Sequence, residues 1–426
     1  LYFVFPIVGI SLVLIFAKYI LKKSLGHGIP NLLYSISQNN AFIKKHNVFS
    51  SIIASALTVG FGGSVGLEGP TVSTGGALGS NIGRLFKLDY KQKVILIGSA
   101  SAAAMSAAFK SPIAGVVFAL EVIMIDLTTF SIVPILLASV CGSLTSYLAS
   151  GTNFLYSFEL KDAFSLEQIP YFIVLGIISG FVALYFTNVY VKISERFQKI
   201  KSSFKRLIIG GSLLGLLIFI FPSLYGEGYE YVNSSLQGEY SQLFTKSVFS
   251  FNQESIFFLI FLLIAMTTLK IVAASLTFGA GGVGGVFAPA LFTGVNLGLL
   301  FALLANNVGI NVSMSNSALV AMAGLIAGVF HAPLTGIFMI GELTGGYALL
   351  FPLMITATIS YIIVRIFRDY NGFKSDRLLE KSTSTFSFAS KCFSIVSYTF
   401  TPSVLTVACV LCITSFTSIV IFLAPL

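Results

Sequence analysis

The amino-acid sequence predicts an all-α, polytopic membrane protein that consists of two related halves and contains broken helices. Hydrophobic residues make up 56% of the 426 residues and charged residues only 10%, whereas soluble domains contain about 25% charged residues. Apolar runs recur along the chain, and several exceed the roughly 18–20 residues that span a bilayer. A pair of motifs that occurs twice divides these runs into two sets.

The apolar runs indicate the membrane helices in order. The first run begins at the first residue, so we expect the first half to lack its first helix. Two segments, 51–83 and 275–300, are cut by Gly or Pro. Irregular backbone at membrane depth is tolerated only where it is buried in protein or lines a polar cavity, so we expect broken helices there. The longer runs are 1–21, 94–125, 131–149, 170–191, 207–222, 255–274, 317–341, 347–367 and 395–426.

Two motifs occur twice, in the same order and at nearly the same spacing. The segment GGSVGLEGP at 62–70 is matched by GGVGGVFAP at 281–289, and both continue into Thr-Gly. The segment FKSPIAGVVFALE at 109–121 is matched by FHAPLTGIFMIGE at 330–342. Internal repeats of this kind place the binding site of a membrane transporter at the interface between the repeats.

Basic residues mark the boundary between the halves. The net charge of +9 comes from short connecting segments and not from a continuous face, so it does not indicate binding to nucleic acid. The densest group lies at 192–206, and the positive-inside rule places it in the cytoplasm. We therefore divide the chain into a first half (1–191), a basic cytoplasmic linker (192–206), a second half (207–368) and a divergent C-terminal segment (369–426) with the composition of one further membrane helix at its end.

Glu68 is the first candidate for a functional side chain. It lies in Gly66-Leu67-Glu68-Gly69-Pro70, where the proline opens a helix and the preceding N–H groups have no partner. Such a helix start carries partial positive charge and free donors, which together make an anion site. A carboxylate there either caps its own helix or competes with a mobile anion, and ionisable groups in membrane segments are usually functional.

Two further helix starts share this pattern. Phe287 takes the place of Glu68 in the second half, before Ala288-Pro289, so this start can bind an anion through its backbone alone unless the ring is simply packed there. His27 lies between two glycines before Pro30. Its ring N–H can donate to an anion, although a single His more often makes an ordinary polar contact.

These three motifs resemble those of the CLC chloride channels and chloride/proton exchangers. The resemblance covers roughly residues 1–368, and its motifs G-x-G-I-P, G-x-E-G-P and G-x-F-x-P occur in the family's order. It implies the CLC fold, with two inverted-topology repeats of broken helices in each subunit. It also implies a homodimer in which each subunit has its own anion pathway, in the bacterial type of the family, without regulatory domains.

The resemblance implies a role for each matched residue. Glu68 matches the gating glutamate, which moves in and out of the outer anion site. The backbone N–H groups of Leu67, Glu68 and Gly69 match the donors of that outer site, and those of Val286 and Phe287 match donors of the central site. His27 stands where most members have a Ser that contacts the central anion, and members with other residues there can prefer other anions.

The sequence departs from the family in two more places. Exchangers carry a second Glu directly after the position of Glu121 as an inner proton relay, and here that residue is Val122, as in channels. The family also has a Tyr whose hydroxyl group completes the central site. Phe373 is the nearest match and Tyr370 the second, and a Phe would contribute no hydroxyl group.

Glu121 and Glu342 occupy equivalent positions in the two halves, each after an apolar run. We interpret both as structural carboxylates that pair with nearby N–H groups or basic side chains. Pro112 and Pro333 are expected to shape the matching helices without touching an ion.

Two functional hypotheses remain. Val122 favours a voltage- or pH-gated anion channel, most simply for chloride, with Glu68 as its gate. The alternative is a proton-coupled chloride/H+ antiporter in which Glu68 is both gate and proton carrier and water replaces the missing glutamate. An enzyme is not expected, because the sequence has no HExxH motif and only three His residues. We expect no cofactor and no metal. The expected transported species are small anions and, in the exchanger, protons, and the expected location is the bacterial inner membrane.

Overall fold

The computed structural model describes residues 2–22, 28–123, 129–151, 166–238, 256–344 and 347–370. These belong to one compact unit, Leu1–Lys374, whereas the second unit, Ser375–Leu426, lies outside the described residues. Within the described ranges the chain is almost entirely helical. The prediction of an all-α protein is therefore confirmed.

The helices follow one another through short connections. Those that precede the basic segment are α1 (Phe5–Ile15), η1 (Phe16–Leu21), α2 (Gly28–Gln38), α3 (Asn47–Gly60), α4 (Glu68–Leu85), α5 (Tyr90–Phe109), α6 (Pro112–Phe118), η2 (Ala119–Ile123), α7 (Thr129–Ser150), η3 (Leu166–Gln168) and α8 (Ile169–Gln198). Those that follow it are α9 (Ser203–Ile220), η4 (Pro222–Leu224), α10 (Tyr229–Gln237), α11 (Ile256–Ala280), α12 (Phe287–Asn307), α13 (Met314–Phe330), α14 (Pro333–Leu343) and α15 (Leu350–Tyr370).

Seven of the described helices are long and apolar enough to cross a membrane. Their outward faces carry large apolar side chains, as on α7, where Val133, Leu137 and Leu144 are exposed. Such faces are stable next to lipid chains and unfavourable in water. The prediction of a polytopic membrane protein is confirmed. The seven spans are Tyr90–Phe109, Ser131–Ala149, Ile169–Gln198, Ser203–Ile220, Ile256–Ala280, Phe287–Asn307 and Leu350–Arg368.

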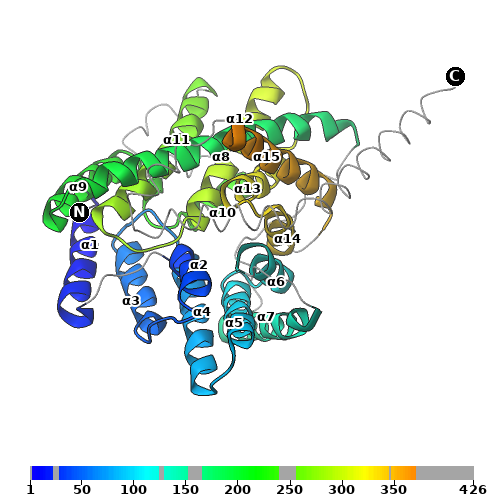
Figure 1. Ribbon diagram of the computed structural model, residues 1–426. Coiled ribbons are helices and arrows are strands. Elements are labelled where there is room, and N and C mark those ends of the chain that lie inside the picture. Colours follow the sequence, from blue (N-terminus) through cyan, green and yellow to red (C-terminus); the bar gives the residue numbers. More distant parts are fainter. Residues whose placement is uncertain are drawn as a thin grey trace. The chain divides into compact units, whose positions relative to one another are not determined.

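The two halves lie side by side. In Figure 1 the blue and cyan helices α2 to α7 lie together in the lower part, and the green to orange helices α8 to α15 lie in the upper part. Contacts between α4 and α12, between α6 and α14 and between α1 and α9 join the halves. The starts of α4 and α12 therefore lie at the boundary between the two repeats.

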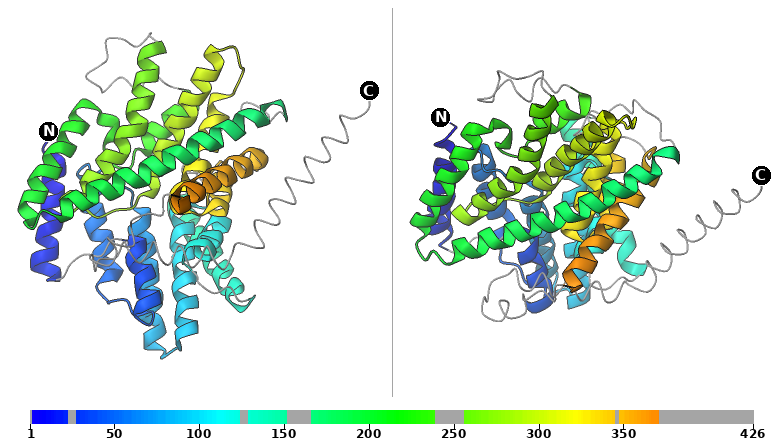
Figure 2. Two further views of the ribbon diagram at one scale, coloured as in Figure 1. Left: turned by 45° about the horizontal axis from the view of Figure 1, so that its top comes forward. Right: turned by 90° about the horizontal axis from the view of Figure 1, so that it is seen from above.

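Helix α8 packs with the second half. It contacts α11, α13 and α15, and in both views of Figure 2 it runs as a long diagonal helix beside them. The sequence predicts that the first half ends at 191/192, where the basic segment begins. In the packing, however, α8 lies with the helices that follow that segment.

Hydrogen bonds between the halves are exchanged reciprocally. The N–H of Val283 donates to Thr58 Oγ1 (3.0 Å), and the N–H of Ser64 donates to Thr277 Oγ1 (3.1 Å). Thr58 and Thr277 are equivalent residues of the repeat, as are Ser64 and Val283. Reciprocal contacts between equivalent groups require a two-fold relation, which inverted repeats have.

The second repeated motif shows the same exchange. Glu342, near the end of α14, accepts hydrogen bonds from the first turn of α6, and Glu121, in η2 just after α6, accepts hydrogen bonds from the first turn of α14. Each carboxylate thereby satisfies two N–H groups that have no partner within their own helix. The prediction that Glu121 and Glu342 pair with nearby N–H groups is confirmed. The donors to Glu342 are the N–H groups of Ile113 (2.9 Å) and Ala114 (2.8 Å), and those to Glu121 are the N–H groups of Leu334 (3.0 Å) and Thr335 (2.8 Å).

Candidate functional site

The start of α4 presents a buried carboxyl group. The helix begins at Glu68, whose side chain is only 4% exposed. The preceding residue, Leu67, makes no side-chain cap. Pro70 suits this first turn because its missing N–H would have no partner within the helix. The sequence therefore produces a helix start whose first N–H groups have no partner within the helix, with a carboxyl group held next to them.

The start of α12 presents the same geometry without a charge. The helix begins at Phe287, and Val286 before it makes no side-chain cap. The ring of Phe287 is 1% exposed and stacks on Phe330, with ring centroids 4.0 Å apart. Phe109, the repeat equivalent of Phe330, lies 6.2 Å from the same ring. The side chain is thus packed among aromatic rings, and only the backbone of this start is left to contact a ligand.

The three glycine-rich helix starts converge. Gly66 and Gly285 form a β-bridge with hydrogen bonds of 2.9 and 2.7 Å, which ties the start of α4 to that of α12. A methyl group added to Gly69 would come within 3.0 Å of the Gly285 Cα. A methyl group added to Gly28, the first residue of α2, would lie 3.7 Å from Gly69 and 3.9 Å from Gly284. Glycine is needed at position 69 because the backbones of α4 and α12 approach each other closely, and it suits position 28 because the φ angle there is +39°.

The carboxyl group of Glu68 occupies this meeting point. Tyr229, the first residue of α10, donates its hydroxyl hydrogen to Glu68 Oε1. The carboxyl group also interacts with the backbone N–H of Ala288 in the first turn of α12. Among the described residues, Glu68 Oε2 is buried and makes no well-aligned hydrogen bond. The side chain therefore lies between the starts of the two pseudo-symmetric helices, on groups that an anion would use.

Sequence reasoning did not identify the side chains on the other side of this carboxyl group. Glu227 Oε1 accepts a hydrogen bond of 2.8 Å from the N–H of Leu67. Glu227 lies in the connection that precedes α10, and Tyr229 is the first residue of that helix. Both come about 160 residues after Glu68 in the chain. Their positions follow from the packing of the two halves, and their sequence context carries no motif that predicts it.

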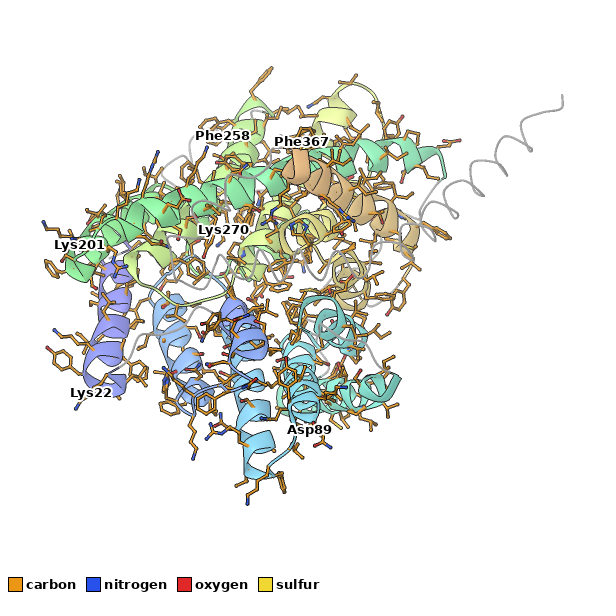
Figure 3. The ribbon with its side chains drawn as sticks, in the orientation of Figure 1. Lys22, Asp89, Lys201, Phe258, Lys270 and Phe367 are labelled. Carbon is orange, nitrogen blue, oxygen red and sulfur yellow. The ribbon has the colours of Figure 1, made fainter. Side chains whose placement is uncertain are left out.

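Sequence reasoning also did not identify Lys270 as a site residue, although its sequence context marks it. It is a cation inside the apolar run 255–274, and such residues are usually functional. Its side chain is 0% exposed in α11, and Nζ donates to the Gly226 carbonyl oxygen at 2.8 Å. Figure 3 shows Lys270 among the central helices, whereas Lys22 and Asp89 lie at the periphery. Lys270 interacts electrostatically with both Glu227 and Glu68.

Two predicted site residues lie outside the described residues. His27 directly precedes Gly28, so only the neighbouring glycine is placed at the meeting point. Phe373 follows the end of α15, and the side chain of Tyr370 is likewise outside the description. Leu67, Gly69, Val286 and Phe287 are brought together with Glu68 at the junction of α4 and α12. Val122 is buried in η2 beside Glu121.

A comparison with known families supports what the geometry indicates. The sequence profile of the family described as "Voltage gated chloride channel" matches residues 8–365. The chain belongs to this CLC family.

Similar proteins include both an exchange transporter and a putative channel by name. The "Putative chloride channel protein ClcB-like" of Ralstonia nicotianae is 27% identical over 81% of this chain and 78% of its own length. The "H(+)/Cl(-) exchange transporter ClcA" of Vibrio cholerae is 29% identical over 72% of this chain. That match spans 64% of the Vibrio protein.

Solved structures share the fold of this CLC chain. A slow cyanobacterial Cl⁻/H⁺ antiporter matches with a TM-score of 0.73 and 23% identity, over 86% of this chain and 83% of its own. A CLC-type fluoride/proton antiporter matches with a TM-score of 0.69 and 24% identity, over 85% of each chain. The CLC fold predicted from the three motifs is therefore confirmed, and the chain is an integral membrane protein of an anion-transporting family.

Proposed function

We propose that this CLC protein exchanges chloride for protons across a bacterial plasma membrane, with Glu68 as both gate and proton carrier. The observation that carries the proposal is the position of the Glu68 carboxyl group. It is buried at the junction of two helix starts whose N–H groups make an anion site. The same group can hold a proton, so one side chain can link the two transported species.

The charge state of Glu68 decides whether an anion can enter. An ionised carboxylate occupies the N–H donors and repels a second negative charge. A protonated carboxyl group is neutral and is displaced easily by an anion. Proton binding therefore favours anion binding at the outer site, and a carboxyl group that leaves the site carries its proton with it. The carboxyl group and the anion therefore occupy the site in turn. If protons also reach Glu68 from the inside, this alternation exchanges chloride for protons.

Val122 favours a channel, and most names of the similar proteins favour exchange. The Vibrio protein and two of the solved structures are named exchangers or antiporters, whereas the Ralstonia protein is named a putative channel. Exchange with Val122 requires water to carry protons from the inside to Glu68, which a polar cavity at membrane depth permits. We also propose a homodimer with one anion pathway in each subunit, on the resemblance to the family.

The deciding experiment records chloride and protons together in liposomes. An outward chloride gradient should drive protons inward against their own gradient, and valinomycin with potassium should speed chloride release. Downhill chloride flux with no proton movement would instead establish a channel. Folded protein that releases no more anion than empty liposomes would remove both hypotheses.

Glu68→Gln is the matched variant for this experiment. The amide has the shape of a protonated carboxyl group but cannot exchange a proton. We expect chloride flux to continue in this variant while uphill proton transport is lost completely. Unchanged chloride flux, pH response and proton coupling would exclude Glu68 from the mechanism.

A further inference from the structure

Glu227 reaches the anion site from a connecting segment. It lies between Gly226 and Gly228, whose φ angles of +60° and +86° are readily adopted only by glycine. This backbone directs the side chain to the start of α4, where Oε1 accepts the N–H of Leu67 at 2.8 Å. The side chain of Glu227 is half-buried.

The bonded N–H group is a donor that the proposed function assigns to the outer anion site. Charge-assisted hydrogen bonds between a carboxylate and a helix-start N–H are stronger than neutral ones. While Glu227 holds the Leu67 N–H, an anion cannot use it. Glu227 thus competes with the anion for a donor at the same helix start as Glu68.

A buried cation balances this second carboxylate. Lys270 Nζ is anchored on the carbonyl oxygen of Gly226 at 2.8 Å and lies 4.8 Å from the ring centroid of Phe292. It interacts with both carboxylates, and Glu227 raises the electrostatic cost of a charge on Glu68. The titratable groups around Glu227 are Glu68 of α4, Tyr229 of α10, Lys270 of α11 and Tyr225 at the end of η4.

We propose that Glu227 is a second gating carboxylate, which holds the Leu67 N–H when ionised and releases it to the transported anion when protonated. This inference rests on the proposed function of Glu68. The charge of Lys270 favours the ionised form of Glu227. Since Glu227 is more exposed than Glu68, it exchanges protons with water directly.

The electrostatic surroundings of Glu227 in the protein fit this role. Burial raises the pKa of its carboxyl group above the ordinary value, while the Leu67 N–H and the charge of Lys270 act in the opposite direction. A raised pKa makes protonation of Glu227 easier as the solution is made acidic. Release of the Leu67 N–H should accordingly increase with falling pH.

A His27→Ser/Glu68→Gln background isolates Glu227, because it removes the titration of the first carboxylate and of the His27 ring. In this background chloride flux should still rise at least about threefold between ~pH 7.5 and ~pH 4.5, over the range in which a carboxyl group titrates. Adding Glu227→Gln should make the flux independent of pH. Adding Glu230→Gln, which changes an exposed carboxyl group on α10, should leave the pH response intact.

Chloride binding measured by calorimetry in detergent provides a second readout that does not need transport. At ~pH 7.5, Glu68→Gln/Glu227→Gln should bind chloride at least about threefold more tightly than Glu68→Gln, because a competing negative charge is gone. Glu227→Asp should retain the pH response with altered affinity. A flat pH profile in the His27→Ser/Glu68→Gln background, or equal chloride affinity with and without Glu227, would overturn the inference. Loss of all flux in the wild type, with the affinity change present, would refute the proposed function and not the role of Glu227.

Discussion

At the scale of single residues, the motifs locate the anion-facing groups but not their partners. Glu68 and Phe287 stand where a helix begins after glycine, and local sequence determines that geometry. Tyr229, Glu227 and Lys270 come from distant segments, and only the packing of the second half against α4 brings them to the site. A single sequence contains no spacing that encodes such a contact. The charge of Lys270 within an apolar run was the one usable signal.

His27 gives a prediction that depends on the sequence alone. Its ring replaces the hydroxyl donor that most members place beside the central anion, and imidazole has an ordinary pKa of ~6.5. A charged ring binds an anion more tightly than a neutral one. We expect His27→Ser to shift the preference for chloride over nitrate or fluoride and to flatten the pH response of flux between ~pH 5 and ~pH 7.5. Anion-exchange rates in liposomes measure both effects, and no change in either would reduce His27 to an ordinary polar residue.

At the scale of elements, equivalent glycines let the helices of each half pack closely. Gly75 and Gly79 of α4 face the backbone of α5, and their repeat equivalents Gly294 and Gly298 of α12 face the backbone of α13. Small residues at such interfaces allow helices in membranes to approach each other. The apolar runs predict these helices well, because length and hydropathy are local properties. They do not predict which helices touch, and α8 shows this by packing with the second half.

These glycines can be tested against a glycine in open space. A methyl group on Gly298 would lie 2.2 Å from the Ser317 carbonyl oxygen, and one on Gly79 would lie 2.6 Å from that of Leu96. Neither backbone can move without separating two helices. We expect Gly298→Ala and Gly79→Ala each to cost about 1–3 kcal/mol of stability.

The control for these variants is Gly60→Ala at the end of α3, where an added methyl group meets no atom within 4 Å. It should leave the thermal unfolding midpoint in detergent close to that of the wild type. The close-packing argument fails if Gly298→Ala is as stable as Gly60→Ala.

At the scale of the whole molecule, the inverted repeat explains why the anion site lies where it does. Equivalent helix starts that point toward a two-fold axis meet at that axis, as the starts of α4 and α12 do at the bridge between Gly66 and Gly285. The repeat was visible in the sequence as two matched motifs. Its reciprocal hydrogen bonds were predicted only in part: the pairing of Glu121 and Glu342 with N–H groups was expected, but not that each would cap a helix of the opposite half.

This exchange of caps predicts that Glu121 and Glu342 stabilise the protein to a similar extent. Glu121→Ala and Glu342→Ala each leave two N–H groups of a helix start without their carboxylate, so each should cost about 1–3 kcal/mol. Glu121 also accepts a hydrogen bond of 2.7 Å from Thr335 Oγ1, so its replacement should cost slightly more. Thermal unfolding in detergent should show a lower midpoint for both variants than for Glu230→Ala, a change of an exposed carboxyl group. Chloride flux per folded protein should remain near that of the wild type, because neither carboxylate lies at the meeting point of the three helix starts. If one variant unfolds like Glu230→Ala while the other is strongly destabilised, the two halves are not held together by equivalent contacts.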